Sequence, residues 1–71
     1  MNSTLEHYRQ VHNDLRTAIE NEPAGDVKAN IVRIADRMRD EIIRASNLID
    51  DGHPEKADKV FERIDKLFNK L

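Results

Sequence analysis

The chain has 71 residues, of which 37% are charged and 38% are hydrophobic, and its 14 acidic and 12 basic residues leave a net charge of -2. This balance gives no overall attraction to nucleic acid or to an anionic membrane, and the lack of cysteine excludes disulfides. A chain of this length makes one domain, residues 1–71, with a core worth roughly 3–5 kcal/mol. Well-packed helices, a partner chain or both must therefore stabilise it.

No apolar run approaches the ~20 residues that a membrane span requires. The first ten residues, MNSTLEHYRQ, have neither the basic start nor the apolar stretch of a signal peptide. We therefore expect a soluble, cytoplasmic protein with no membrane contact.

The first predicted helix covers residues 4–21. Ser3 or Thr4 is suited to cap it, and Pro23 and Gly25 predict a turn after it. Apolar positions recur along one side of this segment, at Leu5, Tyr8, Val11, Leu15, Ala18 and Ile19.

The second predicted helix covers residues 27–50, with Asp26 as its expected cap. One apolar stripe runs along its length, at Val27, Ile31, Ile34, Ala35, Met38, Ile42, Ala45 and Ile49. Val32 and Ile43 lie to one side of this stripe and Leu48 lies to the other. A helix with apolar residues on more than one side is expected to touch more than one neighbour.

The third predicted helix covers residues 54–70. Gly52 is typical of the left-handed residue after a helix, and Pro54 is typical of a first helical residue. The apolar stripe of this segment comprises Ala57, Val60, Phe61, Ile64, Leu67, Phe68 and Leu71. Short connections place successive helices antiparallel. The sequence thus predicts an all-α fold, either a small three-helix bundle or a long hairpin with the first helix packed along it, which self-associates.

Catalytic and metal sites are not indicated. His7 and His12 are five residues apart, about 140° around a helix, whereas a helical metal pair needs a spacing of three or four. His12 lies on the apolar side, where we expect its ring to be hydrogen-bonded at the edge of the core, the alternative being a polar group at an oligomer seam. There is no cysteine nucleophile and no Gly-rich loop, and the carboxylate pairs all have lysine or arginine nearby. We expect no enzyme activity and no cofactor.

Basic residues form two groups. One flank of the third helix carries Lys59, Arg63, Lys66 and Lys70, and Arg33, Arg37 and Arg44 share a side of the second helix. The first interpretation is a charged helix surface with ion pairs such as Glu55–Lys59, Glu62–Lys66 and Asp40–Arg44. The alternative is contact with nucleic acid through the basic flank of the third helix.

The surplus apolar residues of the second helix suggest a protein interface. Val32, Ile43 and Leu48, with Arg39 beside them, are the types of residue that anchor such interfaces. They could instead cover a flank of the first or third helix. The leading hypothesis is a non-catalytic protein–protein interaction module, an adaptor, inhibitor or regulatory subunit, that forms a homodimer. The alternative is a small nucleic-acid-binding regulator.

Overall fold

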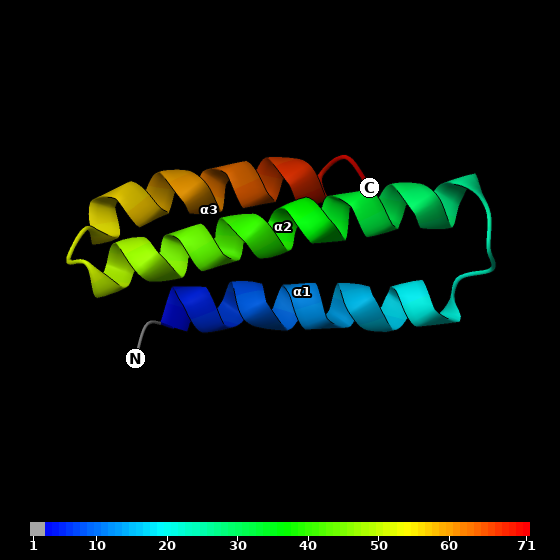
Figure 1. The fold of residues 1–71 in the computed structure, drawn as a ribbon, viewed down its shortest axis with the longest axis horizontal. Coiled ribbons are helices and arrows are strands. Elements are labelled where there is room, and N and C mark those ends of the chain that lie inside the picture. Colours follow the sequence, from blue (N-terminus) through cyan, green and yellow to red (C-terminus); the bar gives the residue numbers. More distant parts are fainter. Residues whose placement is uncertain (1–2) are drawn as a thin grey trace.

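The computed structural model describes residues 3–71 and contains three α-helices (Figure 1). These are α1 (Ser3–Asn21), α2 (Asp26–Asp50) and α3 (Pro54–Phe68). The predicted all-α, three-helix fold is confirmed. The expected domain spans residues 1–71, of which residues 1–2 lie outside the described range, and the described part has no helix long and apolar enough to cross a membrane.

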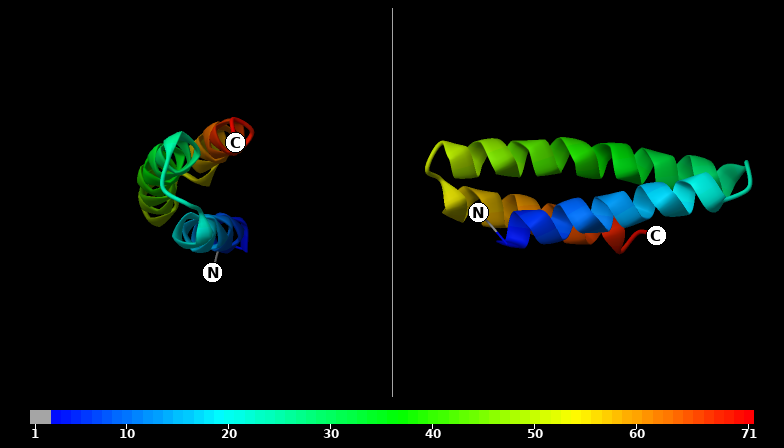
Figure 2. Two further views of the ribbon diagram at one scale, coloured as in Figure 1. Left: turned by 90° about the vertical axis from the view of Figure 1, so that its right-hand side faces the viewer. Right: turned by 90° about the horizontal axis from the view of Figure 1, so that it is seen from below.

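Helix α2 is the central element of the bundle. It packs against both α1 and α3, whereas contacts between α1 and α3 are sparser. The chain reverses direction at each turn, so α1 and α3 run parallel to each other and antiparallel to α2 (Figure 1). The view along the bundle shows α1 and α3 on two sides of α2 (Figure 2). The molecule is elongated, with extents of 41 × 19 × 15 Å.

The turn between α2 and α3 has the predicted local chemistry. Gly52 has a φ of 84°, in the region that favours glycine, and Pro54 is the first residue of α3. The amide of Gly52 donates to the carbonyl of Ile49 at 3.1 Å and that of His53 donates to Leu48 at 2.8 Å. These two bonds are those of a Schellman motif, which satisfies the last carbonyls of α2 and fixes the start of α3.

The turn between α1 and α2 corrects one prediction. Asp26 does not cap α2 but is its first residue, and the N-cap is Gly25, without a side-chain hydrogen bond. Gly25 has φ 155° and ψ -170°, a backbone conformation that is essentially restricted to glycine. Asp26 still stabilises the helix, because a carboxylate in the first turn interacts favourably with the helix dipole.

The core lies where the three apolar stripes meet along α2. Met38 is fully buried, and Val60 and Ile64 are almost as inaccessible. Helices α2 and α3 contribute most of the buried side chains, and α1 contributes two; the full set is Leu5, Leu15, Ile34, Ala35, Met38, Ile42, Ala45, Ala57, Val60, Phe61, Ile64 and Leu67. Burying each large side chain contributes about 1.5–3 kcal/mol, so this small core depends on few residues.

The ends of the predicted stripes are not buried. Helix α3 ends at Phe68 rather than residue 70, and Phe68 and Leu71 are 45% and 50% exposed. Val27 is 63% exposed because it lies in the first turn of α2, which extends past the end of α3 (Figure 1). Ala18 is also exposed.

Tyr8 is the main link between α1 and α3. Its ring stacks on that of Phe61, with centroids 4.8 Å apart and planes 5° apart. Its hydroxyl donates a hydrogen bond of 2.7 Å to Oδ1 of Asp65. Burial, the hydrogen bond to Asp65 and the negative charge of Asp65 raise the pKa of Tyr8 to about 12.

Candidate functional site: the grooves between the helices

Each pair of helices borders a groove on the surface of the bundle. The α1/α2 groove is lined by His12, Ile19, Val32, Ile43 and several charged residues. The α2/α3 groove is lined mainly by arginine and lysine. The α1/α3 groove is lined by Val11, Asp14, Leu15, Ala18, Phe68 and Leu71.

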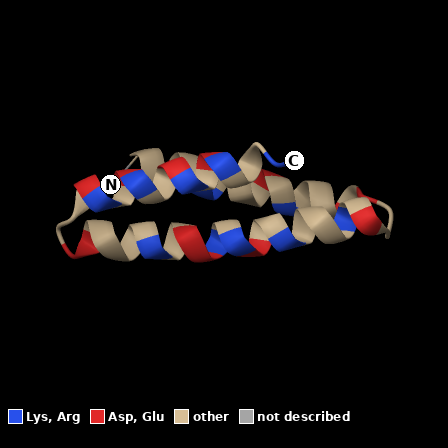
Figure 3. Ribbon diagram, turned by 90° about the horizontal axis from the view of Figure 1, so that it is seen from above, with Lys and Arg blue, Asp and Glu red and all other residues tan. Residues whose placement is uncertain are grey.

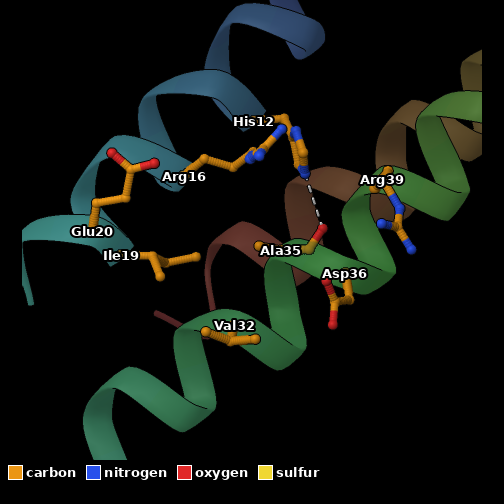
Figure 4. A pocket seen from close by; sticks show the side chains of 8 residues that line it. All are labelled: His12, Arg16, Ile19, Glu20, Val32, Ala35, Asp36 and Arg39. Atoms are coloured by element: carbon orange, nitrogen blue, oxygen red, sulfur yellow. Dashed lines mark hydrogen bonds between the residues drawn. The ribbon is translucent and has the colours of Figure 1, made fainter. Parts of the chain in front are cut away.

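His12 joins the two sides of the α1/α2 groove. Its side chain projects from α1 toward α2, and its Nε2 lies 3.2 Å from the carbonyl oxygen of Ala35 (Figure 4). Because a carbonyl can only accept, Nε2 is the protonated nitrogen in this contact. The expected hydrogen bond of the His12 ring is confirmed, and the side chain is partly buried.

Three of the four residues predicted to form a protein interface border the α1/α2 groove. Val32 lines one of its two adjoining cavities, Ile43 lines the other, and Arg39 borders both. Val32 is partly buried, whereas Ile43 is 52% exposed. Leu48 is separate from them, because it lies in the α2/α3 groove and packs against the core. The observed contacts of Leu48 therefore correspond to the alternative in which it covers a neighbouring helix.

Charges of the two signs are balanced along the α1/α2 groove. Asp36 and Arg39 border it on α2, opposite Arg16 and Glu20 on α1 (Figure 4). Toward the start of α1, Glu6 and Arg9 also line the groove. The cations of the whole groove are Arg9, Arg16 and Arg39, and its anions are Glu6, Glu20 and Asp36.

The α2/α3 groove combines basic residues of two helices. The predicted basic flank of α3 faces two arginines of α2 across this groove. The cations that line the groove are Arg37, Arg44, Lys56, Lys59, Arg63, Lys66 and Lys70. Its anions are Glu41 and Glu62. Blue and red bands alternate along α2 and α3, so acidic residues interrupt the cations along each helix (Figure 3). The groove itself is strongly basic in a chain whose net charge is -2.

Ion pairs in this region differ from those predicted. Nε of Arg63 lies 3.3 Å from Oε2 of the partly buried Glu41, so the contact joins α3 to α2. That oxygen is buried and accepts no hydrogen bond. Across residues 3–71, none of the expected pairs Glu55–Lys59, Glu62–Lys66 and Asp40–Arg44 is within ion-pair distance, and Asp40 is instead 3.8 Å from Arg39.

His7 and His53 have separate surroundings. The ring of His7 contacts the edge of Tyr8, with centroids 5.2 Å apart, and Nδ1 of His53 lies 3.6 Å from Glu55. Within the described residues, no three His, Asp or Glu side chains are grouped as metal ligands.

Sequence reasoning did not predict two of these features. It did not join Arg37 and Arg44 to the basic flank of α3, because the rotation of one helix about another is not encoded in its periodicity. It also gave Ala18, Phe68 and Leu71 only as members of apolar stripes, and did not predict that they border a groove between α1 and α3. Their position at the ends of the stripes was the available signal for exposure.

No family model, no curated protein and no solved structure among those compared with this chain matches it. The functional assignment therefore rests on the geometry, exposure and charge of the three grooves.

Proposed function

We propose that this chain is a non-catalytic protein–protein interaction module that forms a homodimer through its α1/α2 groove. The observation that carries the proposal is that Val32, Arg39 and Ile43 line adjoining cavities of the α1/α2 groove, with Ile43 half exposed. Removal of isoleucine and valine side chains from water by a partner lowers the free energy of the complex, and arginine is enriched at protein interfaces. A dimer would also enlarge the small core of a 71-residue chain.

Charge balance favours a second copy as the occupant of this groove. A two-fold interface places the same surface against itself, so it needs cations and anions that can face each other. Arg9, Arg16 and Arg39 alternate with the same number of carboxylates along the groove. A copy rotated by 180° can therefore pair opposite charges beside the apolar contacts that Val32 and Ile43 would make.

The dimer would leave the other grooves accessible. Such a module acts as an adaptor, an inhibitor or a regulatory subunit, which bind a larger protein without chemistry of their own. Its remaining surfaces would contact that protein.

The double substitution Val32→Asp and Ile43→Asp tests the groove. We expect it to abolish self-association, measured by sedimentation equilibrium, because two unpaired carboxylates would have to be buried in the interface. Helical circular dichroism should be largely kept, since Ile43 is exposed and Val32 is only partly buried. Val27→Asp is the matched control, because it introduces the same charge on α2 at an exposed position outside the groove.

Three results would contradict this interface. The first is a double variant that still associates as the natural chain does. The second is a natural chain that remains a monomer at every concentration studied. The third is unfolding of the double variant, which would show that Val32 and Ile43 support the fold and not a seam between copies.

A second candidate function is the binding of nucleic acid by the α2/α3 groove. The observation that favours it is the convergence of Arg37 and Arg44 with Lys59, Arg63 and Lys66, which widens the basic surface from one helix to two. Cations at such a surface displace the counterions of phosphate groups. Glu41 and Glu62 oppose this attraction, which is why we rank the function second.

Reversal of two charges tests the basic groove. For Lys59→Glu with Lys66→Glu we expect much weaker binding to a labelled DNA duplex, measured by fluorescence anisotropy across a salt series. Each phosphate contact contributes about 0.9 to the slope of log K against log salt, so the loss of two contacts should lower the slope by roughly 1.8. Lys28→Glu with Arg33→Glu makes the same charge change on α2 outside the groove. Equal losses in both variants, or no binding by the natural chain at low salt, would reject this function.

A further inference from the structure

We propose that the α1/α3 groove binds a cationic amphipathic helix of a partner protein, as the fourth helix of a bundle. This inference goes beyond self-pairing, because it uses another face of α1 and a partner of different chemistry. It rests on the apolar lining of the groove, on its acidic surroundings and on the parallel course of α1 and α3.

The lining of the groove supplies an apolar surface for a helix. Val11, Leu15 and Ala18 come from α1, and Phe68 and Leu71 come from the end of α3 and the residues after it. Phe68 and Leu71 are about half exposed, and together with Val27 and Ile43 they are the large apolar side chains most exposed to solvent in the described chain. Phe68 and Leu71 both line this groove. Isolated exposed apolar residues need no explanation, but two in one groove form a surface that a partner can cover.

The arrangement of the helices leaves room for another helix beside this surface. Helices α1 and α3 both pack on α2 and contact each other only sparsely (Figure 2). A helix placed against two parallel helices completes the four-helix arrangement, in which each helix buries one apolar stripe. The Tyr8–Phe61 stack and the Tyr8–Asp65 hydrogen bond hold α1 and α3 at a fixed separation.

The charges around the groove are acidic. Asp14 belongs to its lining, and Asp65, three residues before Phe68 on α3, accepts the hydrogen bond from Tyr8. Asp58 precedes Asp65 by seven residues and therefore lies on nearly the same side of α3, two turns earlier. No lysine or arginine is among the described residues that line this groove.

This charge selects the partner. A second copy that docked by two-fold symmetry would place Asp14, Asp58 and Asp65 opposite one another, which is repulsive. Nucleic acid would be repelled for the same reason. A helix with a stripe of leucine and alanine flanked by lysine satisfies both the apolar lining and the carboxylates.

Two synthetic peptides test the proposal directly. Each is about 18 residues long, roughly 27 Å as a helix, with leucine and alanine at one amphipathic face. One carries lysine at every polar position and the other carries glutamate. We expect the natural chain to bind the lysine peptide and to bind the glutamate peptide at least about tenfold more weakly, measured by fluorescence anisotropy at physiological salt.

Variants of the chain locate the binding. Asp14→Lys with Asp58→Lys should weaken binding of the lysine peptide by about tenfold and strengthen binding of the glutamate peptide, because attraction and repulsion are exchanged. Phe68→Ser should weaken the binding of both peptides. Ile43→Ser removes a similarly exposed apolar side chain from the α1/α2 groove and should leave the binding of both peptides unchanged. All of these positions are exposed, and circular dichroism checks that each variant folds.

The result also separates this inference from the homodimer. The variant with both Val32→Asp and Ile43→Asp should lose self-association and still bind the lysine peptide. The inference is overturned if the lysine peptide does not bind, if the glutamate peptide binds as well, or if binding is unchanged in the Asp14, Asp58 variant. It is also overturned if Ile43→Ser, and not Phe68→Ser, weakens the peptides.

Discussion

Replacing Ile64 with alanine is expected to reduce the free energy of unfolding by about 2–5 kcal/mol. Ile64 is 1% exposed and lies in the core between α3 and α2, so the substitution removes buried methyl groups and leaves a cavity. A domain of this size has roughly 3–5 kcal/mol to lose. A large fraction of the variant should therefore be unfolded at room temperature, as measured by urea denaturation followed by circular dichroism.

Val27→Ala is the matched control for this substitution. Val27 is exposed in α2, and alanine is the better helix former, so its effect should stay within about 0.5 kcal/mol. Both variants are measured at several protein concentrations, because association adds to apparent stability. A loss below about 1 kcal/mol for Ile64→Ala would mean that the core around α3 is not closely packed.

Substitution of Tyr8 should have the second largest effect on the free energy of unfolding. Tyr8→Ala removes both the stack on Phe61 and the hydrogen bond to Asp65, and we expect a loss of about 2–3 kcal/mol. Tyr8→Phe keeps the ring and should lose only the hydrogen bond, about 0.5–1.5 kcal/mol. Denaturation of both variants separates the two contributions, and equal losses would show that the ring stack contributes nothing.

The same tyrosine gives stability a pH dependence in alkaline solution. The pKa of Tyr8 is raised to about 12 in the folded chain, above its ordinary value of 10.0. Below pH 10 both states hold the proton, and between about pH 10 and pH 12 the unfolded state releases it first. The stabilisation is therefore complete below the unfolded pKa and is lost as the pH rises through this window.

Comparison with Tyr8→Phe isolates this dependence, because the lysines that titrate in the same range are present in both proteins. The natural chain should lose stability more steeply than the variant between pH 10 and pH 12, as measured by urea denaturation. Parallel curves for the two proteins would contradict the raised pKa.

The helices could be predicted because their signals are local. Apolar spacing identified all three, and Gly52 and Pro54 fixed the turn between α2 and α3 to within a residue. The N-cap of α2 was missed because both Gly25 and Asp26 are acceptable cap residues, and only the backbone conformation of Gly25 decides between them.

Burial at the ends of the helices could not be predicted in the same way. Val27, Phe68 and Leu71 continue apolar stripes, but whether a stripe is covered depends on the length of its neighbours. Helix α3 has 15 residues and α2 has 25, so the beginning of α2 extends beyond α3. Periodicity gives the direction of a side chain and not what lies opposite it.

The candidate site shows the same limit. Val32, Arg39 and Ile43 could be placed on one surface from the sequence because they share one side of a single helix. The basic groove needed two helices in a definite rotation, and so did the contact between Glu41 and Arg63. Charge spacing along one helix predicted pairs within that helix instead.

The order in which the helices meet has a consequence for folding. Helix α2 packs mainly against its two neighbours in the chain, which are joined to it by the short turns at residues 22–25 and 51–53. Closing short loops costs little entropy, and folds with such local contacts form rapidly. We expect the α2–α3 hairpin to form first, because it contains most of the core. Helix α1 has only Leu5 and Leu15 fully in that core, so we expect α1 to be the first helix to detach when the bundle opens locally.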